Sequence, residues 1–225
     1  MAENRAERIL TVLRGAFTMP TWIVSKRNPF ETLIVTIISQ NTADRNTAKA
    51  FENLSNRFRI TPETLADARL DQIEECLRVA GLYRNKAKTI RQLSGIILNE
   101  FQGRLEKVLS LPLQEARSTL LALPGVGPKT ADVVLLFCGG KPTIPVDTHV
   151  YRVSKRLGLA PDRGSYEVVR ASLQEAYCPE DYAAVHLLLI LHGREYCKAG
   201  VPRCRECPVN KLCPSRCKWD NCDYA

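Results

Sequence analysis

Two helical segments of this sequence are joined by Leu123-Pro124-Gly125-Val126-Gly127-Pro128-Lys129-Thr130. Apolar residues at helical spacing lead up to Leu121 and continue from Thr130 to Phe137. Glycines at alternate positions permit a tight turn, and a turn entering a helix leaves backbone N–H groups pointing outward. Those N–H groups and the helix dipole favour a bound anion. An ordinary helix–helix turn is the alternative, but the flanking Leu-Pro and Lys-Thr-Ala favour a helix-hairpin-helix element that binds a phosphate.

The composition suits a polyanionic partner. Among 225 residues, 32 Lys and Arg stand against 24 Asp and Glu, which gives a net charge of +8. Nucleic acid and an anionic membrane surface both fit such a surplus. No apolar run approaches the roughly 20 residues of a membrane span. The amino end carries charges of both signs, unlike a secretory signal. We therefore expect a protein of the cytoplasm or nucleoid with no membrane partner.

Helical periodicity runs through nearly the whole chain. Asn28, Asp44 and Thr61 are expected to cap helices, and Met19-Pro20 to end the first one. The expected apolar stripes are Ile9, Leu10, Leu13 and Phe17; Leu33, Ile34, Ile37 and Ile38; Ala48, Phe51 and Leu54; Leu70, Ile73 and Leu77; Ile90, Leu93, Ile97 and Phe101; Leu113, Ala116, Leu120 and Leu121. Alternating strand patterns are scarce and no Asn-Gly or Asp-Gly dipeptide occurs. The sequence predicts an all-α fold.

Two charged residues are candidates for chemistry. Lys129 falls in the first turn of a helix, where the dipole disfavours a cation, and a neutral amine there is a competent nucleophile. A surface lysine on a phosphate is the simpler alternative. Asp147, in Pro145-Val146-Asp147-Thr148-His149-Val150, is expected to cap the next helix. Its carboxylate could also stabilise positive charge on a reacting sugar or accept a proton, although capping alone is the commoner role.

Cysteines gather at the carboxyl end, where six of the nine fall in the last 29 residues. Their odd number argues against a complete disulfide framework. Four thiolates suit either Zn²⁺ or an iron–sulfur cluster, and spacing alone leaves both open. Cys217 and Cys222 lie outside this pattern, as free thiols or as a disulfide. The four candidate ligands follow a 6-2-5 spacing: Cys197, Cys204, Cys207 and Cys213.

Together the hairpin sequence and Val-Asp-Thr-His-Val resemble the helix-hairpin-helix DNA glycosylases, and specifically the endonuclease III family, from about Phe30 to Cys213. The resemblance implies that Lys129 is the nucleophile, that Asp147 is the essential carboxylate and that the four spaced cysteines hold a [4Fe–4S] cluster. It further implies a bifunctional DNA glycosylase/AP lyase of base excision repair. Such an enzyme removes oxidised or ring-saturated pyrimidines through a Schiff base and nicks 3′ of the abasic site by β-elimination.

The resemblance also implies two lobes, a six-helix barrel over residues 23–135 and a cluster domain from 1–22 with 136–225. The family glutamine that fills the hole left by a flipped base aligns with Gln40 or Asn41. Leu82 corresponds to a leucine that wedges into the minor groove, and a core leucine is the alternative. The remaining DNA contacts are expected from the hairpin and a basic loop: Gly125, Val126, Gly127, Lys198, Arg203 and Arg205.

Two other functions stay open at this point. A monofunctional glycosylase acting on T or U mismatches would share the fold, but those branches tend to lack lysine at the position of Lys129. A non-catalytic iron–sulfur DNA-binding module would use Lys129 only for a phosphate. His149, His186 and His192 could contribute to base choice, although packing is the commoner role of a lone histidine. The expected partner is double-stranded DNA with a damaged base or abasic site, bound by a monomer.

Overall fold

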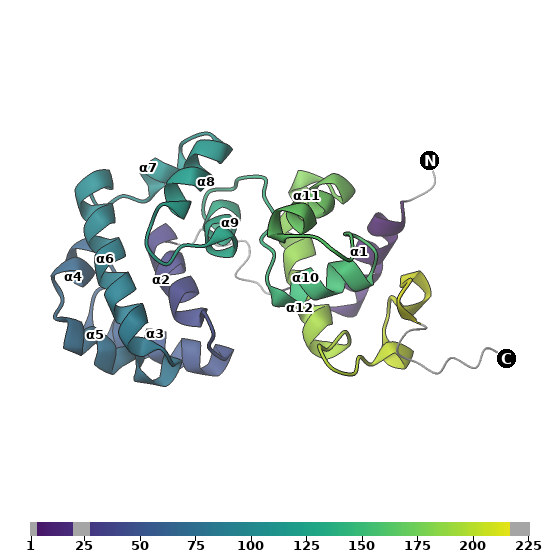
Figure 1. Cartoon of the computed structure of the whole chain (residues 1–225), viewed down its shortest axis with the longest axis horizontal. Coiled ribbons are helices and arrows are strands. Elements are labelled where there is room, and N and C mark those ends of the chain that lie inside the picture. The colour runs from purple at the N-terminus through teal and green to yellow at the C-terminus, as the bar shows by residue number, and fades with distance from the viewer. Residues whose placement is uncertain (1–3, 20–27, 217–225) are drawn as a thin grey trace. The chain divides into compact units, whose positions relative to one another are not determined.

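The computed structural model describes residues 4–19 and 28–216, and these residues form twelve α-helices, several short 3₁₀ helices and no strand (Figure 1). The predicted all-α fold is confirmed. None of the described helices combines the length and the apolarity needed to cross a membrane. Contacts divide the chain into two compact units. We call Lys26–Lys141 the central unit, and Met1–Ser25 with Pro142–Ala225 the terminal unit. That each is an independent domain with the predicted boundaries remains our proposal.

The central unit is built around α6, which packs against α2, α4 and α5. Its core is aliphatic, and Leu33, Ile37 and Ile90 are fully buried. The hairpin-bearing pair α8 and α9 packs together, and α9 also contacts α2. The helices of this unit are α2 (Pro29–Ser39), α3 (Asp44–Arg57), α4 (Pro62–Asp67), α5 (Leu70–Leu77), the 3₁₀ helix η2 (Arg78–Ala80), α6 (Tyr83–Phe101), α7 (Glu106–Leu109), α8 (Leu113–Leu121) and α9 (Pro128–Phe137).

The terminal unit is assembled from both ends of the chain. Its most buried helix, α12, packs against α10 and α1. The Arg5 guanidinium of α1 donates to Leu157 O at 2.6 Å, Gly158 O at 2.7 Å and Leu212 O at 3.2 Å. One arginine thus ties the first helix to the end of α10 and to the cysteine-rich segment. The elements are α1 (Arg5–Ala16), α10 (Thr148–Arg156), α11 (Tyr166–Ala176), η3 (Pro179–Asp181), α12 (Tyr182–Glu195), η4 (Cys204–Glu206) and η5 (Asn210–Leu212).

The predicted helix caps are mostly confirmed. The side chains of Asn28, Thr61 and Asp147 each accept a hydrogen bond from a backbone N–H in the first turn of their helix. The prediction for Asp44 is wrong, because Ala43 is the N-cap of α3 and Asp44 is already its first helical residue. A carboxylate there still suits the helix dipole.

Two details of the expected helices also differ. Ala48 is exposed, and the buried face of α3 consists of Thr47, Ala50 and Leu54. The first helix ends at Ala16, before the expected stop, and Pro20 lies outside the described residues.

Candidate functional site

The hairpin between α8 and α9 is fixed by two different glycines. Gly125 has φ +75°, and a Cβ there would lie 2.4 Å from Thr89 Cγ2, so any side chain is excluded by the fold itself. Gly127, the N-cap of α9, has an extended backbone, and a Cβ on it would meet nothing within 4 Å. The fold therefore requires glycine at 125 and leaves open space at 127, next to the N-terminus of α9.

Val126 points the other way. Its side chain is 6% exposed and belongs to the core of the central unit. Its backbone N–H donates to Leu123 O at 3.2 Å, closing the turn. The expected DNA contact at Val126 is one of the hairpin backbone, so burial of the side chain leaves it a prediction.

A buried ion pair joins the two helices of the motif. Arg117 of α8 donates through Nε to Asp132 Oδ1 at 2.9 Å and through Nη2 to Oδ2 at 3.3 Å. The Asp132 side chain is fully buried and that of Arg117 is 11% exposed. Such a two-pronged pair fixes the relative orientation of two planar groups, so it holds α8 and α9 in register. This pair was not predicted from the sequence.

Lys129 is the second residue of α9 and is half-buried. Pro128 precedes it at the first helical position, where a missing N–H carries no penalty. The Lys129 side chain therefore leaves the helix in its first turn, two residues after the open position at Gly127. This placement agrees with the geometry that the sequence predicted for the candidate nucleophile.

The segment after α2 reaches the hairpin directly. Gln40 Nε2 donates to Gly125 O at 2.9 Å, so two of the predicted DNA-facing elements touch. Asn41, the next residue, is exposed with φ +52°. Gln40 is thus engaged by the protein, whereas Asn41 projects from a left-handed turn.

Leu82 lies on a second exposed turn. It is 61% exposed with φ +45°, directly after Gly81 with φ +61°. The alternative of a core leucine is therefore wrong. A positive φ is costly for a non-glycine residue such as Leu82, so this backbone conformation needs support from its surroundings.

That support comes from Lys86, which the sequence analysis did not select. Lys86 is 5% exposed and its ammonium donates to three oxygens beneath the two turns. Burial lowers the pKa of this amine. A signal was present, because Lys86 stands four residues before Ile90 on the apolar stripe of α6.

Asp147, in the terminal unit, is half-buried and caps α10. Its Oδ1 accepts from Val150 N at 2.8 Å, so one carboxylate oxygen is committed to the helix. The preceding segment is held by two side chains: His186 Nδ1 bonds Pro145 O at 2.8 Å, and Val146 N donates to the Tyr166 hydroxyl at 3.3 Å. His186 thus positions the loop that leads into Asp147.

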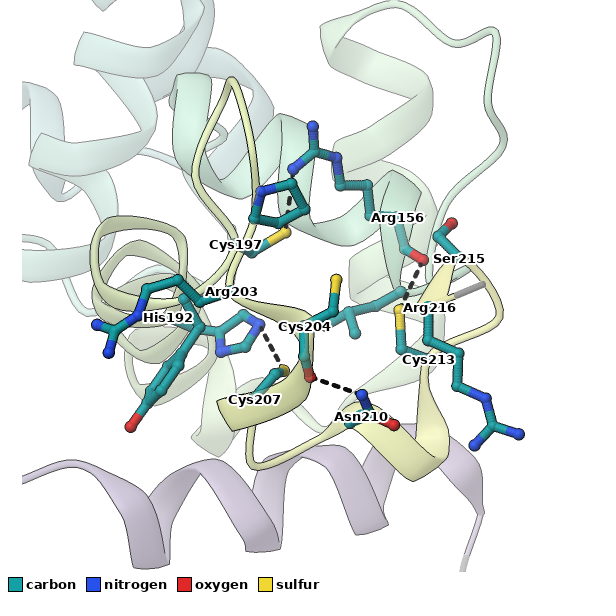
Figure 2. A pocket seen from close by; sticks show the side chains of 13 residues that line it. Arg156, His192, Cys197, Arg203, Cys204, Cys207, Asn210, Cys213, Ser215 and Arg216 are labelled. Atoms are coloured by element: carbon teal, nitrogen blue, oxygen red, sulfur yellow. Dashed lines mark hydrogen bonds between the residues drawn. The ribbon is translucent and has the colours of Figure 1, made fainter. Parts of the chain in front are cut away.

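Four cysteines of the terminal unit line one pocket. In Figure 2 the labelled side chains of Cys197, Cys204, Cys207 and Cys213 all point into it. Burial raises the pKa of the Cys207 thiol to about 12, and the three neighbouring thiols add to the rise. The seven described cysteines form no disulfide among themselves, and Cys217 and Cys222 lie outside the described residues.

Cationic and ring groups surround these sulfurs. Arg156 Nη1 lies 3.5 Å from Cys197 Sγ, and His192 Nε2 lies 3.8 Å from Cys207 Sγ. His192 Nδ1 is buried, with no hydrogen-bond partner among the described residues, and burial lowers the pKa of this ring to about 4. No group of three or more His, Cys, Asp or Glu in the described part of the chain is arranged to hold a single metal ion. Four thiols around one pocket, with donors to sulfur, do fit an iron–sulfur cluster.

The basic loop is less uniform than its sequence. Lys198 and Arg205 are exposed. Arg203 instead pairs with Glu195 at 2.8 Å and with Glu206. These two glutamates balance its charge, so Arg203 is a weaker candidate for a phosphate contact than Lys198 and Arg205.

Comparison with known proteins agrees with these features. Residues 34–179 match the family described as HhH-GPD superfamily base excision DNA repair protein. The chain belongs to the HhH-GPD superfamily. Among similar HhH-GPD proteins is the endonuclease III of Bacillus subtilis (strain 168), 38% identical over 193 residues that cover 86% of this chain and 84% of the relative. The endonuclease III of Escherichia coli (strain K12) is 36% identical over 219 residues, covering 96% and 99%.

Solved structures give the same result. A trapped endonuclease III–DNA covalent intermediate, in an estranged-adenine complex, matches with a TM-score of 0.83 and 34% identity over 97% of this chain and 98% of that one. The predicted resemblance to the endonuclease III family is confirmed.

Proposed function

We propose that this protein is a bifunctional DNA glycosylase and AP lyase of base excision repair. The observation that carries the proposal is the placement of Lys129, a half-buried residue in the first turn of α9, two residues after the open position at Gly127. A similar protein has been trapped as a covalent intermediate with DNA. The substrate we propose is double-stranded DNA with an oxidised or ring-saturated pyrimidine, or an abasic site, bound by a monomer.

The chemistry uses two side chains. The neutral amine of Lys129 attacks C1′ of the extruded nucleotide, and the bond to the base breaks with its electron pair leaving on the base. Asp147 carries a negative charge that stabilises the positive charge developing on the sugar. The C1′–O4′ bond then breaks, O4′ takes up the proton that the amine releases, and the Lys129 nitrogen is left in a Schiff base with C1′. Loss of a proton from C2′ then expels the 3′ phosphate by β-elimination.

Extrusion of the nucleotide falls to the two exposed turns. It costs a few kcal/mol and is cheapest at a damaged or mispaired base. Leu82 is exposed and apolar, as a side chain that replaces lost stacking must be. Asn41 or Gln40 would fill the vacated place. The backbone N–H groups at Gly127 and the exposed Lys198 and Arg205 would hold phosphates.

We propose that Cys197, Cys204, Cys207 and Cys213 hold a [4Fe–4S] cluster. Four thiols lining one pocket and a guanidinium beside one sulfur support it. When bound, the cluster ties distant points of this segment together and supplies a redox centre. Its part in the reaction is structural, because the segment that it shapes presents Lys198 and Arg205.

Borohydride trapping tests the proposal. The protein is incubated with a duplex carrying one thymine glycol, borohydride is added, and the covalent complex is counted for wild type and Lys129→Ala. Lys88→Ala is the matched control, since Lys88 is an exposed lysine on α6. We expect trapping with wild type and the control, and none with Lys129→Ala.

The same assay separates the alternatives. Base release without trapping or strand cleavage would indicate a monofunctional glycosylase. DNA binding without base release, on the damaged duplex and on an abasic-site duplex alike, would leave the non-catalytic module. Sedimentation of the protein at micromolar concentration checks the proposed monomer.

A further inference from the structure

Lys86 is a buried cation whose three hydrogen bonds all go to neutral oxygens. Its Nζ donates to Ile38 O at 2.8 Å, Ala80 O at 2.8 Å and Thr42 Oγ1 at 2.5 Å. An ammonium has three donors, so all of them are used. No carboxylate of the described residues forms an ion pair with Lys86.

The acceptors belong to two separate parts of the central unit. Ile38 and Thr42 flank the turn after α2 that carries Gln40 and Asn41, whereas Ala80 ends η2 immediately before Gly81 and Leu82. The Thr42 hydroxyl adds a direct link, because it also contacts Ala80 O. One amine and one hydroxyl therefore join the base of one exposed turn to the base of the other.

Folding alone does not call for a lysine at this position. Burying a charge without a counter-ion is costly, and the apolar stripe of α6 on which Lys86 stands would accept methionine or leucine. Both turns hold residues in the left-handed region, and such residues persist only where the surroundings over-determine them. The three hydrogen bonds of Lys86 provide that constraint.

We propose that Lys86 is a positioning residue that locks the Gln40–Thr42 turn to the Ala80–Leu82 turn, so that both enter the duplex as one rigid unit. This inference rests on the proposed function, because it assigns the two turns to opening the DNA. Its consequence is selective: loss of the lock impairs extrusion of a stacked base, whereas the chemistry of Lys129 at a site that is already open is spared.

The test compares two reactions of each variant. Lys86→Met keeps the length and apolar stem of the side chain and removes the donors, and Lys88→Met makes the same change at an exposed position two residues along α6. Excision is measured on a thymine glycol paired with adenine, and strand cleavage on a pre-formed abasic site. For Lys86→Met we expect excision to fall about 100-fold, the effect of misplacing groups by about 1 Å, with cleavage close to wild type. Lys88→Met should match wild type in both.

A fluorescent base reports the opening step directly. A duplex with a tetrahydrofuran abasic analogue opposite 2-aminopurine brightens when the wedge unstacks the probe. Wild type should brighten it, whereas Lys86→Met and Leu82→Ala should bind the duplex with little brightening. The double variant should be no worse than either single one, because residues acting as a unit are not additive. Additive losses, or equal losses of excision and cleavage, would overturn the proposal.

Thr42→Val provides a second variant should Lys86→Met fail to fold, since it removes only the bridging hydroxyl. It should shift the excision-to-cleavage ratio in the same direction, and an unchanged ratio would count against the lock. Hydrogen exchange of the amides at 39–43 and 80–83 needs no DNA. If exchange there is faster in Lys86→Met but the wild type shows no glycosylase activity, the structural role of Lys86 is supported and the proposed function is rejected. Unchanged exchange would reject the lock.

Discussion

Asp147 holds two separable properties in one side chain. One oxygen accepts the Val150 N–H and caps α10, and the carboxylate as a whole carries a negative charge. A hydrogen-bond acceptor is all that the helix requires, whereas the proposed reaction requires the charge.

Two substitutions therefore separate these properties. Asp147→Asn keeps an acceptor oxygen, so we expect stability within about 0.5 kcal/mol of wild type, while activity falls by a factor on the order of 10²–10⁴. Asp147→Ala should show the same loss of activity and in addition lose about 1 kcal/mol of unfolding free energy, because the cap is gone. Urea denaturation and single-turnover excision measure the two effects. Full activity in Asp147→Asn would reduce Asp147 to a cap.

The sequence predicts local roles of residues better than distant ones. The caps Asn28, Thr61 and Asp147 could be predicted because each bonds to a backbone group within its own first turn. The burial of Lys86 could be predicted from its place on the apolar stripe of α6, but its partners could not, because the acceptors at 38, 42 and 80 meet it only after the central unit folds. The pairing of Arg203 with Glu195, at the end of α12, was not visible to a local pattern, and the DNA contact of Arg203 stays a prediction.

The helix-hairpin-helix element combines a rigid turn with an open approach. Gly125 is required by the backbone and by Thr89, whereas Gly127 leaves space that nothing in the described protein fills. The ion pair of Arg117 and Asp132 keeps the two helices in register behind that turn. Gly125 and the ion pair thus keep the turn rigid, whereas Gly127 leaves room for a phosphate to approach.

The two glycines are expected to respond differently to alanine. Gly125→Ala should lower the free energy of unfolding by about 1–3 kcal/mol, because it adds a left-handed non-glycine residue and a clash with Thr89. Gly127→Ala should unfold like wild type, yet bind duplex DNA more weakly by obstructing the close approach of a phosphate. Thermal unfolding and fluorescence anisotropy at fixed salt give the comparison. Normal DNA affinity in Gly127→Ala would remove the hairpin from the interface.

The ion pair gives the second prediction for this element. Asp132→Ala leaves the Arg117 guanidinium in a largely buried site and should cost about 3–5 kcal/mol of stability. The double variant Arg117→Met with Asp132→Leu should recover most of this loss, since a matched apolar pair replaces both charges. Urea midpoints of the three proteins test it, and an equally unstable double variant would contradict this explanation.

The whole chain separates its tasks between two units. The central unit carries Lys129, the hairpin and both exposed turns, and the terminal unit carries Asp147 and the cysteine pocket. The composition and helical periodicity predicted the all-α class, which is confirmed, whereas the roles that the motifs assign to the site residues stay predictions. The pairing of Arg203 with Glu195 and the exposure of Leu82 needed the packed chain.

Removal of one cysteine tests this division. If the proposed cluster is held by these four cysteines, Cys207→Ser should abolish its visible absorption and speed hydrogen exchange over residues 197–213, because one of the four links that hold the segment is lost. Amides of α2 and α6 in the central unit should exchange as in wild type. Cys178→Ser is the matched control, since Cys178 is an exposed cysteine of the same unit outside the pocket. A Cys207→Ser protein that keeps the absorption would reject the ligand set.

The terminal unit contains residues from before and after the central unit, so it is able to fold only after the central unit has been synthesised. A ribosome delivers all of Lys26–Lys141 before the first residue of α10, so the central core is able to close during synthesis. Among the described helices α1 emerges first, yet its partners in α12 and at Leu212 follow only after the whole central unit. Through nearly the whole of translation its apolar face, with Ile9 and Leu13, is uncovered by its own unit. Until α12 is made, a chaperone that binds apolar segments is able to bind this face.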